Sequence, residues 1–138
     1  GVGVSFRPIS VLTLNADAVR VGYKSLTSGF QTVLDAPNSG YTSKDVTEYH
    51  AGAEYFFTTK IPFAIRGGYW RDPAHAITFT GPLTSPSAVS ARILYPPQDD
   101  QDHWTVGAGI AFPKFQLDAA YDTSDKFKVG SVSAVVRF

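Results

Sequence analysis

The sequence predicts an all-β protein, an antiparallel meander of about seven strands that is part of a transmembrane outer-membrane β-barrel. Three observations lead to this fold class. Apolar and polar residues alternate in segments that are mostly about ten residues long, as a tilted membrane-spanning strand requires. Long and short connections alternate along the chain, and ionisable residues are confined to one side of the alternating segments.

The composition limits the possible classes of protein. The chain has 138 residues, of which 43% are hydrophobic and 14% aromatic, and it is rich in Gly and Pro, which indicates strands and turns. Lys plus Arg and Asp plus Glu both number 12, so no net charge attracts nucleic acid. Cys and Met are absent, which excludes disulfides and thiolate chemistry. No segment has the continuous apolar length of a membrane helix.

The first two strands are predicted at residues 2–6 and 12–23. The first alternates Val2, Val4 and Phe6 with small or polar residues, and Pro8 is expected to end it. In the second, the phase of the alternation changes after Ala18. A β-bulge at this point would keep Arg20 off the lipid-facing side.

Five further strands follow the same alternation. They are predicted at residues 47–57, 63–70, 103–112, 115–122 and 129–138. In the last of them one face carries Val132, Ala134, Val136 and Phe138, and the other carries Ser131, Ser133 and Arg137, with Val135 as the one apolar exception. An alternating strand that finishes on an aromatic residue suits a strand with one face in lipid and the other toward a polar lumen.

The connections between these strands are of two kinds. Those at residues 7–11, 58–62 and 113–114 are tight, whereas those at about 24–45 and 71–102 are long and polar. The link at residues 123–128 is short but lies on the side of the long loops. Outer-membrane barrels have such short turns at one end and long loops at the other.

The ionisable residues of the predicted strands are candidates to face the lumen of a barrel. These lumen-facing candidates are Asp17, Arg20, Glu48, His50, Glu54, Arg66, Asp118, Asp122 and Arg137. Carboxylate–guanidinium pairs between neighbouring strands are expected among them. Two interpretations remain open: the groups only satisfy one another inside a barrel, or they line a permeation path.

The sequence gives little support to catalysis or to metal binding. His50, His75 and His103 lack the spacing of a metal site, and no catalytic motif occurs. The acidic run that contains Asp99 and Asp100 is interpreted as a solvated loop rather than a cation site. The expectation is therefore a protein that is not an enzyme, with no catalytic residues, no metal ligands and no cofactor.

Several segments together resemble a known family. They are GVGVSFRPISVLTLNADAVRVGY, EYHAGAEYFF, PFAIRGGYWRDPAH, HWTVGAGIAF, FQLDAAYDTSDKF and SVSAVVRF. In this order they resemble the carboxyl-terminal half of FadL-type outer-membrane transport proteins. The resemblance implies a bacterial outer-membrane barrel of about 14 strands that takes up fatty acids or other hydrophobic small molecules. It also implies that Val132, Ala134, Val136 and Phe138 form the signal that the barrel assembly machinery reads.

The chain departs from this family in what it lacks. The plug and the ligand-pocket segments of the family lie in its amino-terminal half, so no ligand-binding residue is carried over. An open sheet of about seven strands leaves two unpaired edges, which lipid does not tolerate. Residues 1–138 are therefore expected to form a single segment of a larger barrel. Its expected partners are outer-membrane lipid and the remaining barrel strands or copies of itself.

Two other interpretations of the strand pattern are kept. One is a self-assembling structural β protein, in which copies of the chain associate edge to edge. The other is a soluble lipocalin-like binding barrel. The alternation by itself does not separate a membrane barrel from a soluble one, because apolar-out and apolar-in arrangements have the same period.

Overall fold

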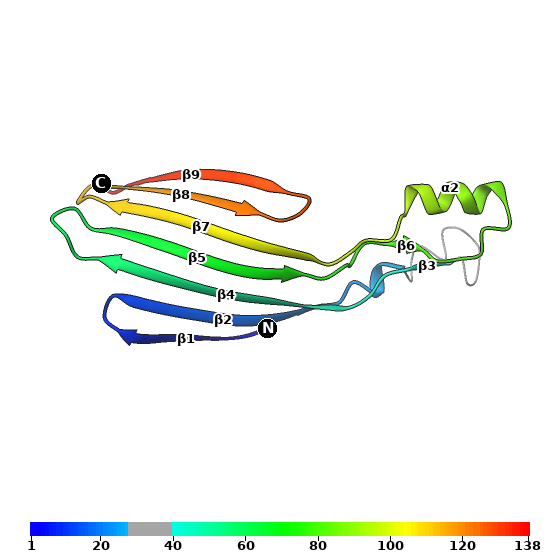
Figure 1. The fold of residues 1–138 in the computed structure, drawn as a ribbon, viewed down its shortest axis with the longest axis horizontal. Coiled ribbons are helices and arrows are strands. Elements are labelled where there is room, and N and C mark those ends of the chain that lie inside the picture. Colours follow the sequence, from blue (N-terminus) through cyan, green and yellow to red (C-terminus); the bar gives the residue numbers. More distant parts are fainter. Residues whose placement is uncertain (28–39) are drawn as a thin grey trace. The chain divides into compact units, whose positions relative to one another are not determined.

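A computed structural model describes residues 1–27 and 40–138 and shows an all-β protein. The predicted antiparallel meander is confirmed, because seven strands lie side by side in the order β1-β2-β4-β5-β7-β8-β9 (Figure 1). Their bounds are β1 Val2–Ile9, β2 Leu12–Val21, β4 Val46–Phe57, β5 Phe63–Asp72, β7 Gln101–Ala111, β8 Phe115–Thr123 and β9 Lys128–Val136. The sheet is not closed: β1 and β9 are its two edges.

The chain divides into two compact units. The first holds the sheet and comprises Gly1–Val19, Glu48–Asp72 and Gln101–Phe138. The second comprises Arg20–Thr47 and Pro73–Asp100 and is built from the two long connections. The middle of the first predicted long loop, residues 28–39, lies outside the described residues.

The predicted end of the first strand is wrong. Pro8 was expected to end the strand, but β1 continues through it to Ile9, which pairs with Leu12. The register with β2 shifts between Phe6 and Ile9. An edge strand tolerates proline because its missing N–H on the outer side breaks no ladder hydrogen bond, and a bulge accommodates the irregular spacing. The pairing of β1 with β2 reaches only to Ala18, so the bulge expected after Ala18 stays a prediction.

The carboxyl-terminal strand is shorter than predicted. Strand β9 ends at Val136, which pairs with Phe115 at the start of β8. The Arg137 amide donates to the Lys114 carbonyl in the turn before β8, and the side chain of Phe138 is fully exposed. The prediction that the strand reaches Phe138 is wrong because β8 offers no ladder partner beyond Phe115.

The second unit contains secondary structure that the sequence pattern did not predict. Strands β3 (Tyr41–Thr42) and β6 (Thr78–Phe79) pair antiparallel, and helix α2 spans Pro86–Leu94. Tyr41 packs edge-on against both Phe79 and Tyr95, with ring centroids 5.2 and 5.1 Å apart. This aromatic cluster gives the long connections a small core of their own.

Helix α2 begins with a recognisable cap. The Ser85 hydroxyl accepts a hydrogen bond from the Ala88 amide at 3.2 Å, and Pro86 follows as the first helical residue. The Arg92 guanidinium donates to the Phe79 carbonyl at 2.6 Å and so ties the helix to β6. No helix in the described part of the chain has the length and apolar character to cross a membrane.

Candidate functional site: a polar hollow crossed by ion pairs

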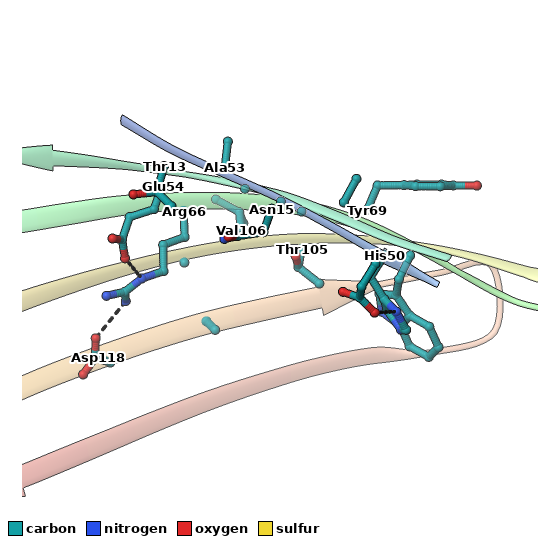
Figure 2. A pocket seen from close by; sticks show the side chains of 18 of the residues that line it. Thr13, Asn15, His50, Ala53, Glu54, Arg66, Tyr69, Thr105, Val106 and Asp118 are labelled. Atoms are coloured by element: carbon teal, nitrogen blue, oxygen red, sulfur yellow. Dashed lines mark hydrogen bonds and ion pairs between the residues drawn. The ribbon is translucent and has the colours of Figure 1, made fainter. Parts of the chain in front are cut away.

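The two faces of the sheet differ sharply in chemistry. Cross-strand register places Glu54 opposite Arg66, Trp70 opposite His103 and Gly109 opposite Asp118, so the polar residues of the central strands share one face. Figure 2 shows Glu54, Arg66 and Asp118 on this side, whereas Ala53 and Tyr69 point away from it. This polar face is the candidate site.

The polar face is also the more enclosed one. The buried residues of the first unit are Ala64, Gln101 and His103, and all three lie on it. A hollow of about 580 Å³ lies along this face and is lined by residues from β2, β4, β5, β7 and β8. Since five adjacent strands line one hollow, the sheet curves around its polar side.

Arg66 is the centre of the first group of contacts in the hollow. Its Nε lies 2.6 Å from Glu54 Oε2 on β4, and its Nη1 lies 2.8 Å from Asp118 Oδ1 on β8 (Figure 2). We call these three residues the Arg66 bridge. Its members come from three strands, and the arginine reaches over β7 to meet Asp118.

Two glycines in β7 make this reach possible. Gly107 is paired with Arg66, and Gly109 is paired with both Ala64 and Asp118, so the arginine passes over backbone that carries no side chain. A Cβ placed on Gly109 would collide with Asp118 Oδ1 and lie 3.0 Å from Arg66 Nη1. Glycine in a strand permits such a close approach, and here the Arg66 bridge supplies the group that approaches.

A second group of contacts lies further along the same face. His50 Nδ1 lies 2.9 Å from Asp17 Oδ1, and His103 Nδ1 lies 2.7 Å from Asp122 Oδ1. The Trp70 indole N–H donates to Asp122 Oδ2 at 3.0 Å. We call these five residues the histidine row.

Arg137 joins the polar face through a glutamine. Its Nη2 donates to Gln116 Oε1 at 3.1 Å, and Gln116 Nε2 donates to Asp118 Oδ2 at 2.8 Å. Hydrogen bonds therefore run from Glu54 on β4 to the end of β9.

Two of the predicted residues lie outside both groups of contacts. Arg20 belongs to the second unit, where its Nη2 lies 3.7 Å from Asp45 Oδ2 and its side chain is largely exposed. Glu48 precedes His50 by two positions on β4 and by alternation shares its face. The structure thus brings together Asp17, His50, Glu54, Arg66, Asp118, Asp122 and Arg137 into two groups of contacts, and neither group includes Arg20 or Glu48.

The acidic run does not gather into one cluster. The Tyr69 hydroxyl donates to Asp102 Oδ1 at 2.7 Å, on the face opposite to His103. Asp100 Oδ1 instead accepts a hydrogen bond from the Ala74 amide in the second unit. Among the described residues no group of three or more potential ligands is arranged to hold a metal ion.

Three contributors to the site were not among the lumen-facing candidates. Trp70, Gln116 and His103 hold the carboxylates of Asp118 and Asp122 in place. All three occupy the polar phase of their strands, and this phase was the signal that could have revealed them.

The residues expected to form an assembly signal lie at an edge of the sheet. Val132, Ala134 and Val136 pair with Ala119, Leu117 and Phe115 on the apolar face. Phe138 follows two residues after the end of β9.

Comparisons of the chain with protein-family models, with curated proteins and with solved structures give no match. The resemblance to FadL-type proteins therefore stays a prediction from the sequence.

Proposed function

We propose that this chain is part of an outer-membrane β-barrel that lets hydrophobic small molecules, such as long-chain fatty acids, pass by diffusion. One observation carries the proposal. The apolar face of the sheet is uncovered, whereas the opposite face curves around an open hollow with paired charges.

The uncovered face is apolar along the central strands. Ile65, Val106, Leu117 and Trp104 are all exposed on it, Trp104 by 62%. Exposing apolar surface to water costs about 25 cal/mol per Å², so a face of this kind needs an apolar cover. Lipid supplies one. Away from the strand ends, where Arg71, Asp102 and Lys128 lie in the apolar phase, charge is confined to the other face, which avoids a cost of about 2–4 kcal/mol for each Arg or Lys at the bilayer midplane.

The hollow fits passage of a small molecule. Its volume of about 580 Å³ falls within the range of ligand cavities. Its charged groups are already paired with one another in the Arg66 bridge. Paired groups do not depend on solvent for their hydrogen bonds, which reduces the cost of moving an apolar solute past them. The choice of hydrophobic compounds as substrates rests on the family resemblance.

A soluble lipocalin-like barrel is less well supported. In that class the apolar side chains line the ligand cavity, and the polar ones face water. Here the hollow lies on the polar side, and the large apolar residues lie on the exposed side.

Association of the chain with itself is a second candidate, favoured by the two free edges of the sheet. β1 and β9 each have a partner on one side only. Unpaired edges are templates for a further strand, in lipid above all. The remaining strands of a larger barrel would satisfy them in the first proposal, and copies of the chain would do so in the second. In the first proposal the apolar face of β9 is the part that the barrel assembly machinery recognises.

The two tryptophans provide the decisive test, because the chain has two and they lie on opposite faces. In Trp70→Phe the remaining Trp104 reports on the apolar face, and in Trp104→Phe the remaining Trp70 reports on the polar face. After reconstitution into vesicles, we expect lipids with brominated acyl chains to quench Trp104 and aqueous acrylamide to quench Trp70.

The opposite pattern, or a monomer that stays folded in water without detergent, would overturn the membrane proposal. Size-exclusion chromatography with light scattering, with and without detergent, supplies this second measurement. Large ordered assemblies in water would instead favour self-association. A fluorescent fatty acid taken up by vesicles that contain the chain and its complementary strands then tests the substrate class.

A further inference from the structure

Trp70 lies between two histidines on the polar face. Its ring is stacked on His103 with centroids 3.9 Å apart and an interplanar angle of 24°. On the other side it stacks on His50 at 5.8 Å and 25°. The three rings come from the neighbouring strands β4, β5 and β7, where cross-strand pairing sets them side by side.

Each histidine has its own carboxylate. Asp17 on β2 lies against His50, and Asp122 on β8 lies against His103. The His103 side chain is 8% exposed, whereas that of His50 is 34% exposed. Across five neighbouring strands, the histidine row therefore consists of a carboxylate, an imidazole, the indole, a second imidazole and a second carboxylate, in this order.

Imidazole is the side chain whose charge depends on pH near neutrality, and the row contains two of them. When both are neutral, the row carries the two negative charges of Asp17 and Asp122. When both are protonated, each carboxylate is compensated and the row is neutral. The other charged groups on this face near the row are Glu48 on β4, Asp72 and Arg66 on β5 and Asp118 on β8.

We propose that the histidine row is a proton-responsive element, in which protonation of the two imidazoles removes two net negative charges from one level of the hollow. On the proposed function, this element makes the passage less attractive to cations in acid, because the local potential follows the fixed charge. The indole is stacked between the two imidazoles and so reports on their state.

The fluorescence of Trp70 tests the proposal directly. In Trp104→Phe, Trp70 is the remaining tryptophan, and an imidazolium stacked on an indole quenches its emission. We expect the emission to fall reversibly as the pH is lowered from 8 to 5. The Cε1–H resonances of His50 and His103 should shift together with the emission.

Histidine variants in this background give matched controls. His50→Gln and His103→Gln should each remove part of the fall, whereas His75→Gln should leave it unchanged. His75 belongs to the second unit, where it stacks on Tyr23. If the buried His103→Gln chain does not fold, the more exposed His50→Gln still tests the assignment.

Emission that is flat from pH 8 to 5, or a fall that neither row variant alters, would overturn the proposal. The titration requires only a folded chain, in detergent or in water. Its failure is therefore distinguishable from failure of the membrane proposal, which the lipid-quenching experiment tests separately.

Discussion

At the scale of single residues, Gly109 shows how the absence of a side chain permits an ion pair. Arg66 on β5 reaches Asp118 on β8 by passing over β7, the strand that carries Gly109. Gly109→Ala places a methyl group against Asp118 Oδ1 and close to Arg66 Nη1. Both groups must move, and we expect a loss of about 1–3 kcal/mol in the free energy of unfolding, as in other overpacked sites. Denaturant unfolding in detergent, followed by tryptophan fluorescence, measures it.

Gly67→Ala is the matched control for this substitution. The new Cβ would meet only the Thr105 carbonyl oxygen, at 4.0 Å. Alanine in a strand restricts the unfolded chain, so this variant should be as stable as the parent or slightly more so. Equal losses of unfolding free energy in the two variants would show that the stability does not depend on the free space above Gly109.

The Arg66 bridge has a second consequence at the residue scale. Arg66→Met leaves the carboxylates of Glu54 and Asp118 facing each other without a cation. Because the arginine side chain is 41% exposed, the expected cost lies between those of surface and buried pairs, at about 1–2 kcal/mol.

A double-mutant cycle with Asp118→Asn measures the coupling between the two residues. The cost of Arg66→Met should shrink in the Asp118→Asn background, because one of the repelling charges is already gone. Additive losses would contradict a direct interaction.

Sequence alternation was enough to assign most site residues to one face, but it did not give their partners. Asp17, His50, Glu54, Arg66, Asp118 and Asp122 were selected because they occupy the polar phase of their strands. Which of them meet depends on the order and register of the strands, and no single strand encodes either. The Arg66–Asp118 contact also depends on the glycines of the strand that lies between.

At the scale of elements, strand positions were predictable where one face is apolar, and strand ends were not. Period-two alternation located all seven strands of the sheet. The predictions at Pro8 and Phe138 were wrong because the end of a strand depends on the pairing with its neighbour. Pro8 lies on an edge strand, where it does not end the pairing, and β8 has no residue that pairs with Phe138. Strands β3 and β6 have only two residues each, too few for any period to be visible.

Helix α2 did carry a local signal, the Ser85–Pro86 start, and this cap is testable. Ser85→Ala removes the acceptor of the Ala88 amide and should destabilise the helix by about 1 kcal/mol. Amide hydrogen exchange should become faster in α2 and stay unchanged in the seven-stranded sheet.

Ser90→Ala is the control for the cap, since the Ser90 hydroxyl only bonds back to the Pro86 carbonyl within the helix. Alanine has the higher helix propensity, so exchange in α2 should not become faster. Faster exchange in both variants would mean that the cap has no special role.

At the scale of the whole molecule, the number of strands restricts what can complete the sheet. The pairs β1–β2, β4–β5, β5–β7, β7–β8 and β8–β9 all run antiparallel. The Phe56 amide donates to the Val11 carbonyl, and His50 pairs with Asp17. Since the contact moves back along β4 as it moves forward from Val11 into β2, these two strands run antiparallel as well. With seven alternating strands, β1 and β9 point in the same direction. An all-antiparallel barrel therefore needs an odd number of additional strands.

Copies of this chain meet that requirement only in a particular way. Two copies that point in the same direction across a membrane can join β9 to β1 only as parallel strands. Two copies related by a two-fold axis can join β1 to β1 antiparallel, but they then point in opposite directions. Insertion from one side of a membrane forbids the second arrangement, whereas a detergent micelle permits it.

Cysteine cross-linking distinguishes these arrangements, and the chain has no cysteine of its own to interfere. With cysteines placed one at a time along β1, we expect a disulfide-linked dimer for at least one position in detergent and for none after insertion from one side of a vesicle. Ile65→Cys is the control, because β5 is paired on both sides and its edges are not free. Dimers in both media would show that copies pair irrespective of a membrane, which favours the self-assembling protein. Monomers in both would contradict the prediction and show that β1 does not pair with itself even where the orientation of the copies permits it.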